Sequence, residues 1–221
     1  MPRPRRRQPV AASSAESASL RPGRGARTGR RVQRVRIVGG KWKRTPLAVP
    51  DVPGLRPTPD RVRETLFNWL GQSLEGRTCL DPFAGSGALG LEAASRGARR
   101  VLMVERDRVA AAAIRAAIER LGADAVELIV DDALEALRRL ARAAELFDVV
   151  LLDPPFGHDL IQQALPLVAP LLAPGACVYV ETDTPLAPPP GWRLERAARA
   201  GNVHYHLIGR ADAHPPGGSR R

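Results

Sequence analysis

Hydrophobic and polar residues follow two periods along most of this chain, the period of strands and the period of amphipathic helices. Short apolar runs typical of buried parallel strands lie at 79–80, 101–104, 126–130, 147–152 and 176–181. Amphipathic segments follow the first four runs, at 87–96, 109–121, 133–143 and 160–172, and the last contains Pro166 and Pro170, which should break or kink it. Repeated strand–helix units predict an α/β fold with a parallel sheet and right-handed crossovers.

The pattern differs on both sides of this region. Before it, Val35–Val38 alternates and leads through Gly39-Gly40 and Lys41-Trp42-Lys43-Arg44 to residues 46–50, which predicts a small basic β-hairpin with an aromatic residue at its tip. Residues 61–70 predict an amphipathic helix, for which Thr58 can act as the cap. After it, residues 192–196 and 203–208 predict a terminal antiparallel hairpin.

Composition divides the chain into four segments. Residues 1–31 are mostly Pro, Arg, Ser, Gly and Ala, and we expect this Arg-rich tail to be disordered, together with residues 211–221. Residues 32–72 form the predicted N-terminal hairpin and helix, and residues 73–210 the main α/β domain. Neither tail contains enough large apolar residues to build a core.

The net charge of +11 is concentrated at the N-terminal side. Residues 1–31 carry +8, residues 32–50 carry +5, and the remainder carries −2, so a nucleic acid is the natural partner. A solubilising role is an equal alternative for the tail. In the hairpin we expect RNA contacts from the cations and from one aromatic ring, which suits base stacking: Arg36, Lys41, Trp42, Lys43 and Arg44. Packing against the main domain is the alternative for Trp42.

The two cysteines indicate the cellular compartment of the protein. Cys79 and Cys177 each lie in an apolar segment, with neither Cys nor His nearby at metal-ligand spacing. We expect both to be reduced, which predicts a cytoplasmic protein without a metal site. No apolar run reaches the length of a membrane span. A monomer is favoured, although the oligomeric state is left open.

A glycine-rich turn between the first strand and the first helix predicts a nucleotide-like ligand. Gly85, Gly87 and Gly90 have the G-x-G-x-x-G spacing, which allows close approach to the backbone and tight helix packing. Glu105 ends the next strand, where its carboxylate can accept both hydroxyl groups of a ribose. The two features together predict a cofactor that contains adenosine.

Further carboxylates favour S-adenosylmethionine over a nicotinamide dinucleotide. Asp81 precedes the glycine turn, where it would attract an amino-acid ammonium and repel a pyrophosphate. Asp132, preferred to Asp131, can bond the adenine amino group, cap the following helix, or do both.

The fourth strand ends in Asp153-Pro154-Pro155-Phe156, a rigid turn that carries an acid and a ring. The amino group of a nucleobase is a poor nucleophile because its lone pair is conjugated into the ring. The Asp153 carboxylate and the Pro154 carbonyl can accept its two hydrogens, and Phe156 can stack on the base. This arrangement predicts methyl transfer to a ring amino group through positioning and electrostatics.

These motifs resemble those of class I S-adenosylmethionine-dependent amino-methyltransferases, and more closely the RsmD family of 16S rRNA guanine-N2 methyltransferases. The resemblance covers residues 34–210 and is carried by residues 36–42, 54–58, 60–70, 83–91, 179–181 and 200–205. It implies a Rossmann-like, seven-stranded, mostly parallel sheet. The implied catalytic residues are Asp153, Pro154, Pro155 and Phe156, and the implied cofactor-binding residues are Arg56, Thr58, Asp81, Phe83, Ala84, Gly85, Ser86, Gly87, Glu105, Asp132 and Asp153.

The resemblance implies a guanine of small-subunit rRNA, free or in an assembling 30S particle, as the substrate. The residues of the tip alone do not separate guanine from adenine, so an adenine-N6 methyltransferase stays an alternative. A nicotinamide-dependent oxidoreductase and a non-catalytic RNA-binding protein are the others, and the latter would not need Asp153. The Arg-rich extension at 1–31 is not typical of the family.

Overall fold

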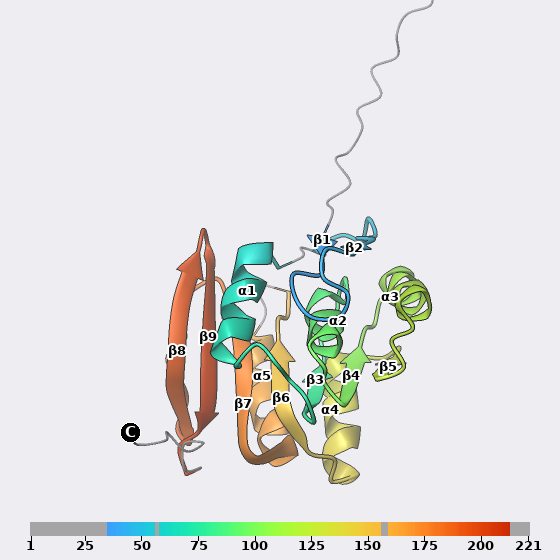
Figure 1. Cartoon of the computed structure of the whole chain (residues 1–221). Helices are drawn as coiled ribbons and strands as arrows, with labels where there is room; N and C mark the ends of the chain where they lie inside the picture. The colour runs from blue at the N-terminus through green and yellow to red at the C-terminus, as the bar shows by residue number, and fades with distance from the viewer. Residues whose placement is uncertain (1–34, 56–57, 156–158, 213–221) are drawn as a thin grey trace, which may run out of the picture. The chain divides into compact units, whose positions relative to one another are not determined.

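The computed structural model describes residues 35–55, 58–155 and 159–212. In this part of the chain, a seven-stranded sheet has the order β5-β4-β3-β6-β7-β9-β8 (Figure 1). The first five strands in this order are parallel, and the last two run antiparallel to their neighbours. The strands are β3 (Thr78–Asp81), β4 (Arg100–Val104), β5 (Val126–Ile129), β6 (Phe147–Leu152), β7 (Leu172–Thr182), β8 (Trp192–Ala200) and β9 (Val203–Arg210).

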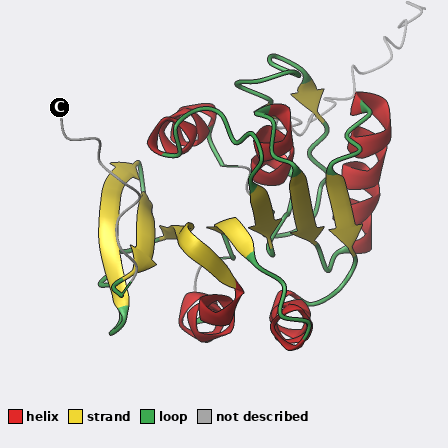
Figure 2. Ribbon diagram, turned by 60° about the horizontal axis from the view of Figure 1, so that its bottom comes forward, coloured by secondary structure: helices red, strands yellow, loops and turns green. Residues whose placement is uncertain are grey.

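Helices cover both faces of the sheet (Figure 2). Strand residues alternate between two hydrophobic cores: Val149 and Leu151 of β6 belong to one core, and Val150 and Leu152 belong to the other. The first core also contains residues of α1 (Asp60–Trp69), α2 (Ala88–Ser95) and α3 (Arg108–Leu121). The second contains residues of α4 (Ala133–Arg142), α5 (Leu160–Val168) and the 3₁₀ turn η1 (Ala169–Leu171).

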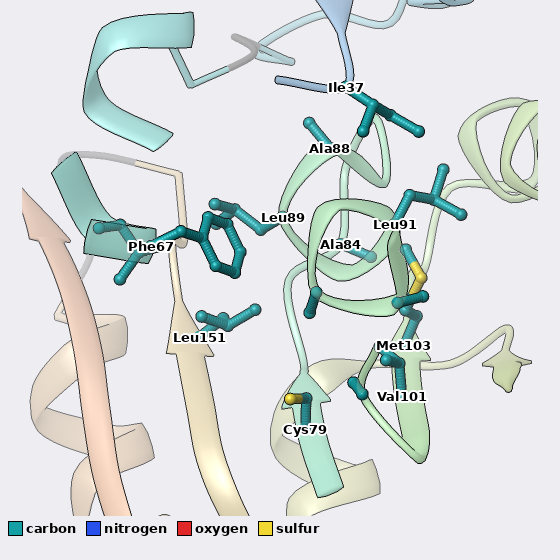
Figure 3. Packing of buried hydrophobic residues seen from close by; sticks show 14 of the residues in the cluster. Ile37, Phe67, Cys79, Ala84, Ala88, Leu89, Leu91, Val101, Met103 and Leu151 are labelled. Carbon is teal, nitrogen blue, oxygen red and sulfur yellow. The ribbon is translucent and has the colours of Figure 1, made fainter. Parts of the chain in front are cut away.

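The N-terminal hairpin shares the first core. Its strands, β1 (Val35–Arg36) and β2 (Pro46–Leu47), pair antiparallel as predicted, although each is only two residues long. Ile37 is fully buried and packs near the start of α2, while Phe67 of α1 reaches the same core from the other side (Figure 3). The hairpin and α1 are therefore positioned by the core that supports the sheet. The domain boundaries at 31, 72 and 210 stay predictions.

The predicted α/β order is confirmed, with differences at the element ends. Strand β7 begins at Leu172 rather than at 176, and β8 continues to Ala200 rather than ending at 196. Pro166 lies inside α5 without ending it, whereas Pro170 lies in the 3₁₀ turn that follows. Among the described residues, no helix combines the length and apolar character needed to cross a membrane.

Candidate active site

A cavity of about 880 Å³ opens at the carboxyl ends of the parallel strands. The chain leaves β3 toward β4 on one side, while β6 lies on its other side. Such a switch point is where open α/β sheets bind ligands. The walls include predicted site residues that follow β3, β4, β5 and β6, together with Thr58 before α1: Thr58, Phe83, Ala84, Gly85, Ser86, Glu105, Asp132, Asp153, Pro154 and Pro155. The volume is within the usual range for a small-molecule site.

The glycine turn has the backbone shape that its sequence predicts. Gly85 and Gly87 have φ values of 55° and 76°, in the left-handed region that favours glycine. Gly90 serves packing instead, because a Cβ atom there would lie 2.8 Å from the sulfur of Met103 on β4. Gly90 therefore lets α2 approach the sheet, and Gly85 lies on the cavity wall. Gly87 faces the core, where a Cβ atom would lie 3.1 Å from Ile114 and Met103.

Glu105 is fixed at the end of β4 by two backbone donors. The amides of Gly85 and Asp107 donate to its Oε2 and Oε1 atoms, each at 2.7 Å. These bonds link the glycine turn to the next strand end. Because each carboxylate oxygen can accept more than one hydrogen bond, Glu105 can still receive ribose hydroxyl groups.

Asp81 is the clearest indication of a cationic ligand. Its side chain is buried, the Gly90 amide donates to Oδ2 at 3.0 Å, and Oδ1 has no hydrogen-bond partner among the described residues. Burial, and then the charge of Asp153, raise the pKa of Asp81 to about 8. A ligand ammonium would satisfy this carboxyl and favour its ionised form. The acidic, glycine-lined cavity thus fits S-adenosylmethionine.

Asp132 caps helix α4, which was one of the two roles predicted for it. Its Oδ1 atom accepts hydrogen bonds from the backbone amides of Leu134 and Glu135. Asp131 instead forms an ion pair with Arg139. Both aspartates line the cavity, and the adenine contact predicted for Asp132 stays a prediction.

The acid at the end of β6 has a partner that the sequence pattern did not predict. Thr58 donates its hydroxyl hydrogen to Oδ2 of Asp153 at 2.9 Å. The expected capping role of Thr58 is wrong, because Pro59 is the N-cap of α1 and no side chain caps this helix. Thr58 is held against the tip of β6 instead. Phe156 and Arg56 lie outside the described residues.

A second carboxylate beside the tip was missed at the sequence level. Glu181 near the end of β7 lines the cavity, although only 3% of its surface is exposed. Tyr179 donates to its Oε1 at 2.7 Å. The signal was available: β7 is another apolar strand that ends in an acid, and parallel strands end at the same edge of the sheet.

The basic hairpin is attached to α2 through a buried carboxylate. Glu92 is fully buried and accepts the amides of Val38 and Gly39, each at 2.7 Å. It also pairs with Arg63 of α1 and with Arg96. This acid fixes the base of the hairpin loop, which presents the predicted RNA-contacting side chains.

The hairpin loop combines exposed cations with a partly packed indole. Arg36 is largely exposed and donates to Asp60 at 2.8 Å. Lys43 and Arg44 are also exposed, while Lys41 lies over the ring of Trp42 at 5.6 Å. Trp42 is half-buried and packs on the first core, so its predicted packing role is confirmed.

Comparisons with known proteins agree with this geometry. The model of the family described as "Conserved hypothetical protein 95" matches residues 35–209. Ribosomal RNA small subunit methyltransferase D of Haemophilus influenzae is 42% identical over 179 residues, which cover 78% of this chain and 92% of that protein. The protein of the same name from Escherichia coli K12 is 41% identical over 182 residues, with coverages of 80% and 90%.

Solved structures give the same result. The structure of the candidate methyltransferase yhhF from Escherichia coli has a TM-score of 0.72 and 40% identity, and the match covers 82% of this chain and all of that one. A hypothetical protein of Thermus thermophilus has a TM-score of 0.67 and 32% identity, with coverages of 78% and 98%. The chain therefore belongs to the RsmD family of methyltransferases.

Proposed function

We propose that this protein transfers a methyl group from S-adenosylmethionine to the exocyclic N2 of a guanine in small-subunit (16S) rRNA. One observation carries the proposal: the Asp153-Pro154-Pro155 tip forms part of the wall of a cavity whose other walls suit this cofactor. Membership of the RsmD family supports rRNA as the substrate class. The preference for guanine comes from the resemblance to this family.

Three features of the cavity wall and one buried acid would hold the cofactor. At the wall, Glu105 would accept the ribose hydroxyl groups, Asp132 would accept the adenine amino group, and the turn at Gly85 allows close contact with the backbone. Asp81, which is buried next to the lining residue Pro82, would pair with the ammonium. When bound, S-adenosylmethionine supplies a methyl group on a cationic sulfur that leaves with the electron pair of the broken bond. The carboxylate of Asp153, and that of Asp81 once a ligand ammonium favours its ionised form, would complement this cation.

The tip would prepare the amino group of the base. Asp153 and the Pro154 carbonyl can accept its two hydrogens, which favours a pyramidal nitrogen with its lone pair directed at the methyl group. Pro154 and Pro155 restrict the backbone, so the acceptors are held in place before the base arrives. After transfer the nitrogen loses a proton to solvent or to Asp153, and no strong base is needed.

The basic hairpin would provide the approach for RNA. Lys41, Lys43 and Arg44 lie on one loop attached to α2, and Arg36 lies on the adjoining strand β1. These cations can contact phosphates, and the exposed part of Trp42 can contact a base. Free rRNA and an assembling 30S particle are both possible partners, and this substrate implies a cytoplasmic enzyme.

Two alternative reactions differ in their chemistry from the proposal. A nicotinamide-dependent reaction would place a pyrophosphate beside the glycine turn, next to the unpaired oxygen of Asp81, where like charges repel. An adenine-N6 methyltransferase would use the same tip. The identity of the methylated nucleoside separates it from the proposed enzyme.

The test incubates the protein with labelled S-adenosylmethionine and with 16S rRNA, assembly intermediates or mature 30S subunits. Nucleoside analysis should show N2-methylguanosine, whereas N6-methyladenosine or no labelled nucleoside would refute the proposal. Asp153→Ala should abolish transfer while cofactor binding persists. Asp124→Ala is the matched control, because Asp124 is exposed and is not among the residues of the cavity.

A further inference from the structure

A second cavity, of about 760 Å³, adjoins the cavity that suits the cofactor. The two share Pro154, Pro155 and Glu181 in their walls, so they meet at the tip of β6. Most of the other walls of the second cavity come from α5, from the segment between β7 and β8, and from Trp192 and Arg210. The proposed reaction gives this cavity no ligand, although an RNA strand that brings a base to the tip also brings neighbouring nucleotides.

The segment between β7 and β8 is fixed against the sheet, so this cavity is preformed. The Leu186 amide donates to Nε2 of His206 at 3.2 Å, and His206 is buried on β9. The Trp192 amide donates to the carbonyl of Pro189 at 3.1 Å, and the prolines along this wall restrict its backbone. A wall that is already ordered lowers the entropic cost of binding a ligand.

One end of the second cavity presents an aromatic ring next to a cation. The indole of Trp192 is half-buried and packs on the second core, and the guanidinium carbon of Arg210 lies 5.8 Å from the centroid of the indole ring. The side chain of Arg210 is 36% exposed and pairs with Asp212. Unpaired bases of RNA stack on aromatic rings and on the planes of arginine guanidinium groups. This end of the cavity therefore suits a base.

The remainder of the cavity carries carboxyl groups. Asp159 and Asp183 are exposed, and Glu181 lies where the two cavities meet. Carboxylates repel phosphate groups but accept hydrogen bonds from the amino groups of bases. The charges therefore favour a strand whose bases point into the cavity and whose phosphates stay outside it. Such a strand is unpaired, because a duplex encloses the edges of its bases.

The cavity is long enough for more than one nucleotide. Along β7, Trp192 lies at a level before Cys177, whereas the tip of β6 lies at a level after Val180. The part of β7 between these two levels alone spans about 10 Å. A cavity of this length exceeds a single base and suits a short stretch of one strand.

We propose that the second cavity binds unpaired nucleotides of the substrate RNA that flank the target base, with one base stacked on Trp192 and Arg210. This inference rests on the proposed function, because it extends the path of the RNA beyond the base at the tip. The shared wall at Pro154 and Pro155 makes the path continuous. The basic hairpin then contacts phosphates of another part of the same RNA.

The first experiment separates stacking from packing. Trp192→Leu keeps an apolar side chain on the second core but has no ring, whereas Trp192→Phe keeps both. Trp192→Leu should raise the KM for rRNA and the Kd for single-stranded RNA about tenfold, and Trp192→Phe should stay within about threefold. The affinity for S-adenosylmethionine should not change in either variant. Equal values in the two folded variants would overturn the inference, because a packing role alone predicts that result.

Arg210→Ala should also weaken the binding of single-stranded RNA. Arg138→Ala is its matched control, because Arg138 is likewise an exposed arginine paired with an acid but is not among the residues of either cavity. Arg138→Ala should leave the affinity unchanged. Equal affinities in the two variants would count against the proposed contact with Arg210.

Fluorescence measures stacking without catalysis. Trp42→Phe combined with Trp69→Phe leaves Trp192 as the last of the three tryptophans. Short oligoadenylate should quench its emission, whereas oligoadenylate paired with oligouridylate in a duplex should not. The anisotropy of a dye on the RNA shows whether RNA is bound. Bound oligoadenylate without quenching, or equal quenching by the duplex, would overturn the inference.

These results also separate the inference from the proposed function. Quenching by oligoadenylate without formation of N2-methylguanosine in rRNA would reject the proposed reaction and keep the RNA site. Formation of N2-methylguanosine without quenching, and with equal KM values in Trp192→Leu and Trp192→Phe, would reject the inference alone.

Discussion

The buried acid at the base of the hairpin gives the sharpest prediction about stability. Glu92 accepts two backbone amides of the hairpin and pairs with Arg63 and Arg96. Arg63 is itself fully buried, and this burial lowers its pKa while the charge of Glu92 opposes that effect. Glu92→Ala would leave two partly buried N–H groups and a buried cation with fewer partners.

The cost follows from these contacts. Removing one partner of a buried ion pair costs about 3–5 kcal/mol, and each unsatisfied buried donor costs about 1–3 kcal/mol. These terms do not add fully, because Arg63 keeps Asp60 and the carbonyl of Arg36, and Arg96 keeps the carbonyl of Gln72. We expect Glu92→Ala to lower the free energy of unfolding by about 4 kcal/mol.

Urea unfolding at fixed pH measures this loss. Glu135→Ala is the matched control, because Glu135 is also a helical glutamate paired with an arginine, but both side chains are exposed. That control should lose less than about 1 kcal/mol. Hydrogen exchange in Glu92→Ala should rise in the loop at 38–45 before it rises in the strands. Equal losses in the two variants, or unchanged exchange in the loop, would refute the reasoning.

Three further predictions concern the cavity, the helix packing and the RNA contacts. Asp81→Asn should weaken S-adenosylmethionine binding in calorimetry. Because burial raises the folded pKa of Asp81 above its unfolded value, ligand-free stability should fall as pH rises from about 4 to 8, and Asp81→Asn should flatten this slope in urea unfolding; an unchanged slope would contradict the burial argument. Gly90→Ala should cost about 1–3 kcal/mol in thermal unfolding, because its Cβ atom would lie 2.8 Å from the Met103 sulfur, and an unchanged Tm would contradict this packing. Lys43→Ala should weaken rRNA binding and reduce the salt slope by about 1, whereas Arg138→Ala on α4 should not; equal slopes would exclude the hairpin contact.

Much of the fold follows from local patterns. The run 147–152 was predicted from its apolar residues alone, and β6 has the same bounds. The predicted positions of strand ends were less accurate where Pro or Gly lie in extended backbone, as at the start of β7. Asp153 and Glu105 were placed at one edge because parallel strands with right-handed crossovers all end on the same side.

Partners distant in sequence required the tertiary structure. Thr58 is 95 residues from Asp153, and Glu92 is 54 residues from Val38. A threonine before a helix has a strong local preference for capping, and only the packing of α1 beside the β6 tip gives its hydroxyl a different acceptor.

The amino-acid sequence by itself determined the order of strands and helices, the glycine turn and the acids at the strand ends. These depend on periodicity and on backbone preferences within a few residues. The tertiary structure alone decided which of those acids are buried, which hydroxyl donates to Asp153, and which helix holds the hairpin. Burial and hydrogen-bond partners depend on the packing of distant segments, and in this protein burial raises the pKa of Asp81 and of Glu181.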